Sequence, residues 1–233
     1  PVVMDEQFNS AVTDIFRNEY LSPRSPYTTL QIPKQGIGEW CHPLHTVDID
    51  DSGLRSSVQK GVLNTKLGVP FRTPAEGQNI AFTSLWDNYP DSLTVSLKGK
   101  ASRAYLLMAG STNHMQCHID NGLIRVYYKD GTCDKMALRN PDNWAPIEHI
   151  FFEDGLAFNR HAPALYRLRL KTGEISNNFG EELGFPGASR ELDGGAAILL
   201  EMPLNPDKKL SHLVLETLSN DVVIGLMGIT LQR

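Results

Sequence analysis

A short stretch of the chain, Trp86-Asp87-Asn88-Tyr89, offers the side chains that proteins use to hold sugars. An aromatic ring can cover the C–H face of a sugar, while carboxylate and amide groups hydrogen-bond its hydroxyls. The same residues also suit a packed turn, because the segment that follows alternates apolar and polar residues as a strand does. Tyr89 and Pro90 favour the packed turn, whereas Trp86 and Asp87 stay candidates for a binding lip at a strand end.

A second polar set lies near the middle of the chain, where His114 and Gln116 follow an apolar run. If this segment is extended, His114, Gln116 and His118 point to one face, because side chains alternate along a strand. Polar groups at the end of a buried strand suit recognition of a hydroxylated ligand, and they also suit an exposed sheet edge. Both interpretations stay open at this point.

A third set lies in residues 140–149, where prolines flank Trp144 and Glu148 follows. Here too one loop offers an aromatic plate and a carboxylate. The alternative is that Trp144 plugs the loop onto the sandwich as a core side chain. The candidate saccharide-binding residues are therefore Trp86, Asp87, Asn88, Tyr89, His114, Gln116, Trp144 and Glu148.

Hydrolysis of a glycosidic bond would need two carboxyl groups about 5 to 10 Å apart. The acidic candidates are Asp87, Glu148, Glu153 and Asp154, but no spacing singles out a pair. The sequence also has no nucleophile elbow, Walker loop or dinucleotide fingerprint. We therefore predict no catalytic residue, and a glycoside hydrolase that uses Asp87 and Glu148 is the alternative function.

Two segments carry metal-ligand residue types without a complete pattern. Residues 48–53 resemble the start of a calcium loop, but Gln59 stands where an EF-hand needs a bidentate glutamate. An acidic turn in solvent, or a calcium site of another type, accounts for them. Residues 40–45 hold one cysteine and two histidines, yet no second Cys/His pair completes a zinc site. We predict no metal and no cofactor.

Length and composition describe an ordinary globular chain. It has 233 residues, of which 41% are hydrophobic and 21% charged, and its formal net charge is -5. The negative charge and the lack of a basic run argue against nucleic acid. The longest apolar run, residues 222–231, is about half a membrane span, so we predict no span. Because the chain starts at Pro1 without a leader pattern, we expect a processed chain or part of a larger protein.

The first 78 residues read as a helix followed by irregular chain. Apolar residues at helical spacing, with Asp5 as a possible N-cap, predict a helix over residues 5–20 that ends before the following prolines. Residues 27–32 predict a short strand. Gly, Pro, Ser and Asp are then frequent up to residue 78, so we expect an N-terminal segment that wraps a core supplied by later residues.

From residue 79 onward the pattern is strand and turn. Strands are predicted at residues 79–85, 92–97, 103–111, 123–129, 132–138, 166–171, 196–204, 210–218 and 222–231. Asp130-Gly131 predicts a type I′ hairpin turn. Residues 105–110 are apolar on both faces, which is typical of a central strand. We predict an all-β antiparallel sandwich over residues 79–233, of jelly-roll or galactose-binding-like type, with a short N-terminal helical segment and a long inserted loop region at about 139–195.

The sequence also contains three distinctive phrases: SPRSPYTTLQIPKQGIGEWCHP, FTSLWDNYPDSLTVSLKGKASRAYLLMAGSTNHMQ and YYKDGTCDKMALRNPDNWAPIE. They resemble the C-terminal region, a domain of unknown function, of large secreted proteins from gut-type Bacteroidota. Those proteins look like glycoside hydrolases with a helical-toroid catalytic domain. The resemblance covers residues 13–233, and the strand order is similar, at the level of fold only, to galactose-binding-like sandwiches.

This resemblance implies an exported protein, a saccharide context and an N-terminal catalytic domain as a partner. It assigns a catalytic role to no residue of the chain. We therefore expect a non-catalytic accessory module that either binds glycan or braces a catalytic domain.

Overall fold

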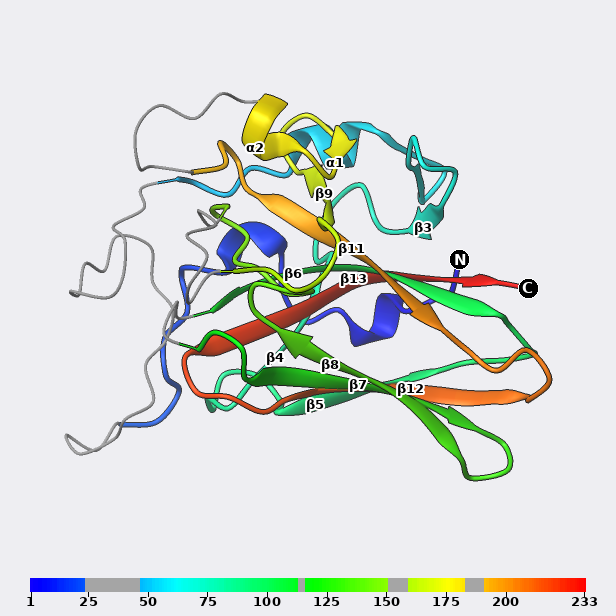
Figure 1. Cartoon of the computed structure of the whole chain (residues 1–233). Helices are drawn as coiled ribbons and strands as arrows, with labels where there is room; N and C mark the ends of the chain where they lie inside the picture. The colour runs from blue at the N-terminus through cyan, green and yellow to red at the C-terminus, as the bar shows by residue number, and fades with distance from the viewer. Residues whose placement is uncertain (24–46, 113–115, 151–158, 183–190) are drawn as a thin grey trace.

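The computed structural model describes residues 1–23, 47–112, 116–150, 159–182 and 191–233 (Figure 1). Within these residues thirteen strands form sheets of six, four and three strands, and every pairing between the strands is antiparallel. The prediction of an all-β antiparallel sandwich is confirmed. No described helix is long and apolar enough to cross a lipid bilayer.

The six-stranded sheet has the order β10-β9-β11-β6-β13-β4. Its strands are β4 (Ala81–Ser84), β6 (Arg103–Thr112), β9 (Tyr166–Arg169), β10 (Ile175–Ser176), β11 (Ala196–Pro203) and β13 (Val222–Gln232). The four-stranded sheet has the order β5-β12-β7-β8. Its strands are β5 (Ser92–Ser96), β7 (Asp120–Tyr128), β8 (Cys133–Arg139) and β12 (Leu210–Thr217).

A third, small sheet precedes the sandwich in the chain. It has the order β1-β2-β3, with β1 at Val58–Gln59, β2 at Val62–Asn64 and β3 at Pro70–Arg72. The helical elements are short, namely the 3-10 turns η1 (Asp5–Gln7) and η2 (Val12–Asp14) and the helices α1 (Ser52–Ser56) and α2 (Phe179–Glu182). The small sheet was not predicted, because its strands have only two or three residues each and lack a measurable period.

The six-stranded sheet is apolar on both faces and forms the middle layer of the molecule. Along β6, Leu106 and Met108 belong to the core shared with the four-stranded sheet. The alternate residues Leu107 and Ala109 belong to a second core on the opposite face. The prediction that this strand is central and covered on each side is therefore confirmed.

Residues 1–23, which we call the N-terminal segment from here on, supply side chains that cover this second core, and so do α1 and the small sheet. Val12, Leu54 and Phe71, one from each of these three parts, are all fully buried in it. The predicted helix over residues 5–20 is wrong in extent, since only η1 and η2 form. The backbone amides of Asn9 and Ser10 donate to the carbonyl of Ile80 instead, which a continuous helix would not allow.

The strands predicted from residue 79 onward are all present, and the predicted strand at residues 27–32 lies outside the described residues. The β7–β8 hairpin pairs Arg125 with Lys135, as expected. Its turn differs from the prediction, because Gly131 has a positive φ of 85° whereas Asp130 does not. A type I′ turn needs positive φ at both positions. The region predicted as an inserted loop also contributes β9 and β10 to the edge of the six-stranded sheet.

Four connections gather at one end of the sandwich, on the left in Figure 1. Val223 at the start of β13 pairs with both Ser84 and Ser111, so β4 and β6 end at the same level on either side of β13. The amide of Leu218, after β12, donates to the carbonyl of Asn121 at the start of β7 (2.9 Å). We call this region the loop end and define it as residues 85–91, 116–119, 140–149 and 218–221.

Candidate functional site

The loop end collects every predicted site residue that the structure describes. Four of them follow β4, Gln116 precedes β7, and Trp144 and Glu148 follow β8. His114 lies outside the described residues. Loops at one end of a rigid sandwich are where binding residues commonly lie, so the position agrees with a ligand site even though the individual side chains differ widely in exposure.

Both tryptophans of the loop end are buried. Trp86 is 2% exposed and packs in the second core, whereas Trp144 is 0% exposed and packs in the core between the two large sheets. The ring of Trp144 occupies the space above Gly110, where a Cβ would lie 2.7 Å from two ring carbons. In the described structure neither ring presents a flat face to solvent.

Asp87 is exposed, but its carboxylate is engaged with the N-terminal segment. It accepts hydrogen bonds from the backbone amides of Leu21 (2.8 Å) and Ser22 (2.9 Å), and from the Ser22 hydroxyl. Hydrogen bonds to an ionised carboxylate are among the stronger ones in proteins. Asp87 therefore anchors residues 21–22 to the loop end.

Asn88 and Tyr89 also contact the N-terminal segment. The side-chain amide of Asn88 donates to Asn18 Oδ1 (3.3 Å), and the Tyr89 hydroxyl lies 3.5 Å from Ser10 Oγ. The Tyr89 ring packs at 5.2 Å from that of Phe82, and burial raises the pKa of its hydroxyl. These contacts are those of a packed turn, as Tyr89 suggested from the sequence.

Glu148 is a buried carboxyl group that lies beside Ser111 and Arg167. The Ser111 hydroxyl donates to it (3.2 Å), and burial raises the pKa of Glu148 to about 7. Burial likewise lowers the pKa of Arg167 to about 10. The Arg167 guanidinium donates to the carbonyls of Pro146 (2.6 Å) and His149 (2.8 Å), so it pins the backbone on both sides of Glu148.

The segment that holds Gln116 turns sharply after it. The backbone of Cys117 forms an isolated parallel β-bridge with that of Asn140. The next residue, His118, has a positive φ of 54°, which is uncommon for a residue other than glycine. The extended conformation on which the alternation of Gln116 and His118 depends is therefore not present at His118. Gln116 Oε1 is buried without a hydrogen-bond partner among the described residues.

His118 instead lies beside two residues from a different part of the chain, Asp142 and His161. Its Nδ1 is 3.9 Å from Asp142 Oδ2, and His161 Nδ1 is 3.7 Å from Asp142 Oδ1. The two imidazole rings are 4.9 Å apart between centroids. No sequence pattern predicts this cluster, because its members come from three separate loops and match no short motif.

Two asparagines hold these loops in place, one through its side chain and one through its backbone carbonyl. Asn121 is fully buried, and its amide donates to the carbonyls of Gln116 (3.0 Å) and Ile119 (3.2 Å). The carbonyl of Asn140 accepts from the His118 amide (2.7 Å). The backbone on either side of His118 is therefore fixed by protein hydrogen bonds.

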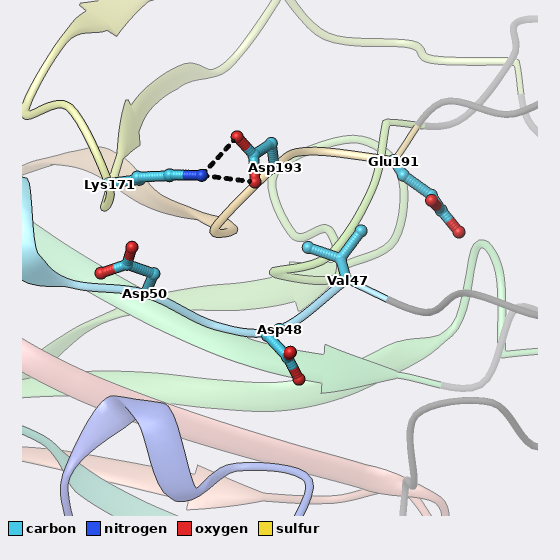
Figure 2. A pocket seen from close by; sticks show the side chains of 6 residues that line it. All are labelled: Val47, Asp48, Asp50, Lys171, Glu191 and Asp193. Atoms are coloured by element: carbon cyan, nitrogen blue, oxygen red, sulfur yellow. Dashed lines mark hydrogen bonds and ion pairs between the residues drawn. The ribbon is translucent and has the colours of Figure 1, made fainter.

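An acidic pocket of about 500 Å³ lies farther along the same end, beside β11 (Figure 2). Figure 2 shows Lys171 and Asp193 pointing toward one another, and their charged groups are 2.8 Å apart. The carboxylates of Asp48 and Glu191 point away from that pair. The pocket thus lacks a point on which its carboxylates converge.

Two acidic side chains of the stretch at residues 48–53 have protein partners. Asp50 accepts from the Ser52 amide (2.9 Å), and hydrogen bonds from Ser52 lower the pKa of Asp50. Asp51 pairs with Arg55 at 2.8 Å. Among the described residues, only His118, Asp142 and His161 bring three metal-binding atoms within 4.8 Å of one another.

Comparison with known proteins does not add to this picture. No family model, curated protein sequence or solved structure matches the chain.

Proposed function

We propose that the chain is a non-catalytic accessory module of an exported carbohydrate-active protein, with the loop end as its saccharide-binding surface. The observation that carries the non-catalytic part is what Asp87 and Glu148 contact, since the other two acidic candidates, Glu153 and Asp154, lie outside the described residues. Asp87 holds Leu21 and Ser22 in place, and Glu148 is buried beside Ser111 and Arg167. Both carboxyl groups are thus engaged with other parts of the chain, whereas glycoside hydrolysis needs two carboxyl groups that act on the same bond.

The saccharide part rests on the resemblance of the sequence to a region of secreted glycoside-hydrolase-like proteins, together with the grouping of polar side chains at the loop end and of His161 beside it. Gln116, His118, Asp142 and His161 supply donors and acceptors of the kind that bond sugar hydroxyls. Because Trp86 and Trp144 are buried, the proposed contacts are polar, and the tryptophans act as the scaffold beneath them.

The test is thermal unfolding and calorimetry of the whole chain against a panel of plant and host oligosaccharides, with a chelator present. A ligand that binds the native state raises the melting temperature in proportion to ln(1 + [L]/Kd). We expect at least one saccharide to do so, with a smaller shift in Gln116→Ala and an unchanged shift in Gln59→Ala, a site in the small sheet. If no saccharide binds, the module braces a catalytic domain instead, which is the second form of the proposal.

An assay for glycoside hydrolase activity tests the alternative function. We expect no release of reducing ends from the same panel, with or without Asp87→Asn and Glu148→Gln. Turnover that disappears in both variants would contradict the non-catalytic proposal and support the hydrolase.

A further inference from the structure

We propose that His118, Asp142 and His161 form a binding site for one divalent transition-metal ion of the zinc type. The three side chains offer two imidazole nitrogens and a carboxylate oxygen within 4.8 Å of one another. Imidazole and carboxylate together are common protein ligands of zinc. The inference concerns metal binding by the chain itself and does not depend on saccharide binding.

The distances within the cluster favour a shared ion over direct hydrogen bonds. The two N–O separations, 3.7 and 3.9 Å, are too long for hydrogen bonds between the side chains. Two ligand atoms bound tetrahedrally to one zinc ion, each about 2.1 Å from it, lie roughly 3.4 Å apart. The two N–O separations run to different oxygens of Asp142 and exceed this value slightly, and one ligand atom from each residue lies within 4.8 Å of the others, so side-chain rotations would bring the three ligands onto one ion.

The His118 ring also lacks a partner for one of its nitrogens. Its Nε2 is buried and has no hydrogen-bond partner among the described residues, although the side chain as a whole is 30% exposed. Buried polar atoms of this kind are rare in native proteins and usually have a ligand, water or ion beside them. The ion satisfies this atom if it binds through Nε2; if it binds through Nδ1, which lies 3.9 Å from Asp142 Oδ2, the ring proton stays on Nε2.

The backbone holds the ligands in place before an ion arrives. The His161 amide donates to Asp142 Oδ1 (2.6 Å), which links two of the three ligands directly. The carbonyl of Asn140 fixes the backbone at His118 (2.7 Å). Such supporting hydrogen bonds orient metal ligands and raise the affinity of natural sites.

The exposure of the cluster leaves room for further ligands on the ion. The side chains of Asp142 and His161 are 20% and 64% exposed. Three protein ligands with one open side are the arrangement found in zinc sites that hold water or a small molecule in the fourth position.

The experiment is calorimetric titration of the chelator-treated whole chain with Zn²⁺ alone, followed by Co²⁺ as a spectroscopic probe. We expect binding of one ion per chain and a rise in melting temperature, and visible absorption bands when Co²⁺ binds. His161→Ala and Asp142→Asn should each weaken Zn²⁺ binding at least about tenfold. His212→Ala is the matched control, since His212 stacks on Tyr127 away from the cluster, and its affinity should equal that of the native chain.

His161→Ala removes an exposed side chain, so its unfolding midpoint without metal should match the native value and confirm that it folds. Native-like Zn²⁺ affinity in both ligand variants would overturn the proposal, because the ion would then be bound by other residues. No Zn²⁺ binding by the native chain would overturn it as well, and would indicate that water molecules join the three side chains.

Discussion

The hydroxyl oxygens of Thr83 and Thr217 lie 2.7 Å apart and join the two large sheets by a hydrogen bond. Thr83 belongs to β4 and Thr217 is the last residue of β12, and both are buried. Thr83 Oγ1 also donates to the carbonyl of Ile224 (3.3 Å), so Thr217 is the donor within the pair. The other contacts between these two sheets are largely apolar. This hydrogen bond therefore fixes the relative position of the two sheets near the loop end.

We expect Thr83→Val to destabilise the chain more than Thr217→Val does. Loss of Thr83 leaves the Thr217 hydroxyl buried without this partner, at a cost of about 1–3 kcal/mol. Loss of Thr217 leaves Thr83 with its bond to Ile224 and should cost about 1 kcal/mol. Urea unfolding of the single and double variants measures the coupling. Additive costs in the double variant would show that the two hydroxyls do not interact.

Glu148 makes the stability of the chain depend on pH. Burial raises its pKa to about 7 from an ordinary value of 4.5, so between these values the folded state retains a proton that the unfolded chain releases. Protonation of Glu148 therefore contributes fully to the free energy of unfolding below pH 4.5, and this contribution is lost as the pH rises through about 7. The loss from this one group is about 3 kcal/mol.

Glu148→Gln removes that titration and keeps the shape of the side chain. The difference in free energy of unfolding between this variant and the native chain should grow in favour of the variant from pH 4.5 to 7. Glu6→Gln, at an exposed glutamate, is the control and should show no comparable trend. A flat difference for Glu148→Gln would mean that Arg167 neutralises the carboxylate in the folded state.

Glycine is the only residue type that fits at position 110, beneath the Trp144 ring. A Cβ there would lie 2.1 Å from the carbonyl oxygen of Val223 and 2.7 Å from the Trp144 ring. Gly110→Ala should therefore destabilise the chain by about 3 kcal/mol or more. Gly77→Ala, where an added Cβ meets no atom within 4 Å but φ is +76°, should cost about 1–2 kcal/mol. Equal costs at the two sites would contradict the tight packing of Trp144.

Asp87 should govern how firmly residues 21–22 are attached. Asp87→Ala removes the acceptor of two backbone amides and should cost about 1–2 kcal/mol. Limited proteolysis near Leu21 should become faster in this variant. Asp91→Ala, at another exposed carboxylate of the same loop, is the control and should leave the cleavage rate unchanged. Equal cleavage rates in both variants would show that Asp87 does not anchor the segment.

The strands were predictable from sequence because their signal is local. Alternation in residues 92–97 and the long apolar run in β13 follow directly from which faces are buried. The helix predicted over residues 5–20 failed because its apolar spacing is real but its amides bond elsewhere. The amide of Val12 donates to the side chain of Asn79 (2.9 Å), a partner that no local pattern reveals.

The same contrast between local patterns and partners distant in sequence applies to the candidate site. The sequence located the loop that contains Trp144 and Asp142, but an aromatic residue type does not say whether its ring faces solvent or core. The cluster of His118, Asp142 and His161 depends on the ends of separate strands meeting in space. Only the fold brings such residues together, so their pairing could not be inferred from spacing.

The position of β13 also constrains how the chain folds. β4 and β6 do not pair with each other, because β13 lies between them, and β13 follows every other described strand in sequence. Until it arrives, both strands have open edges that can recruit other chains. β4 and β6 are far from β13 in sequence, and contacts between distant segments form slowly. We therefore expect the middle layer to be completed only when β13 pairs, and its open strand edges to favour aggregation before that step.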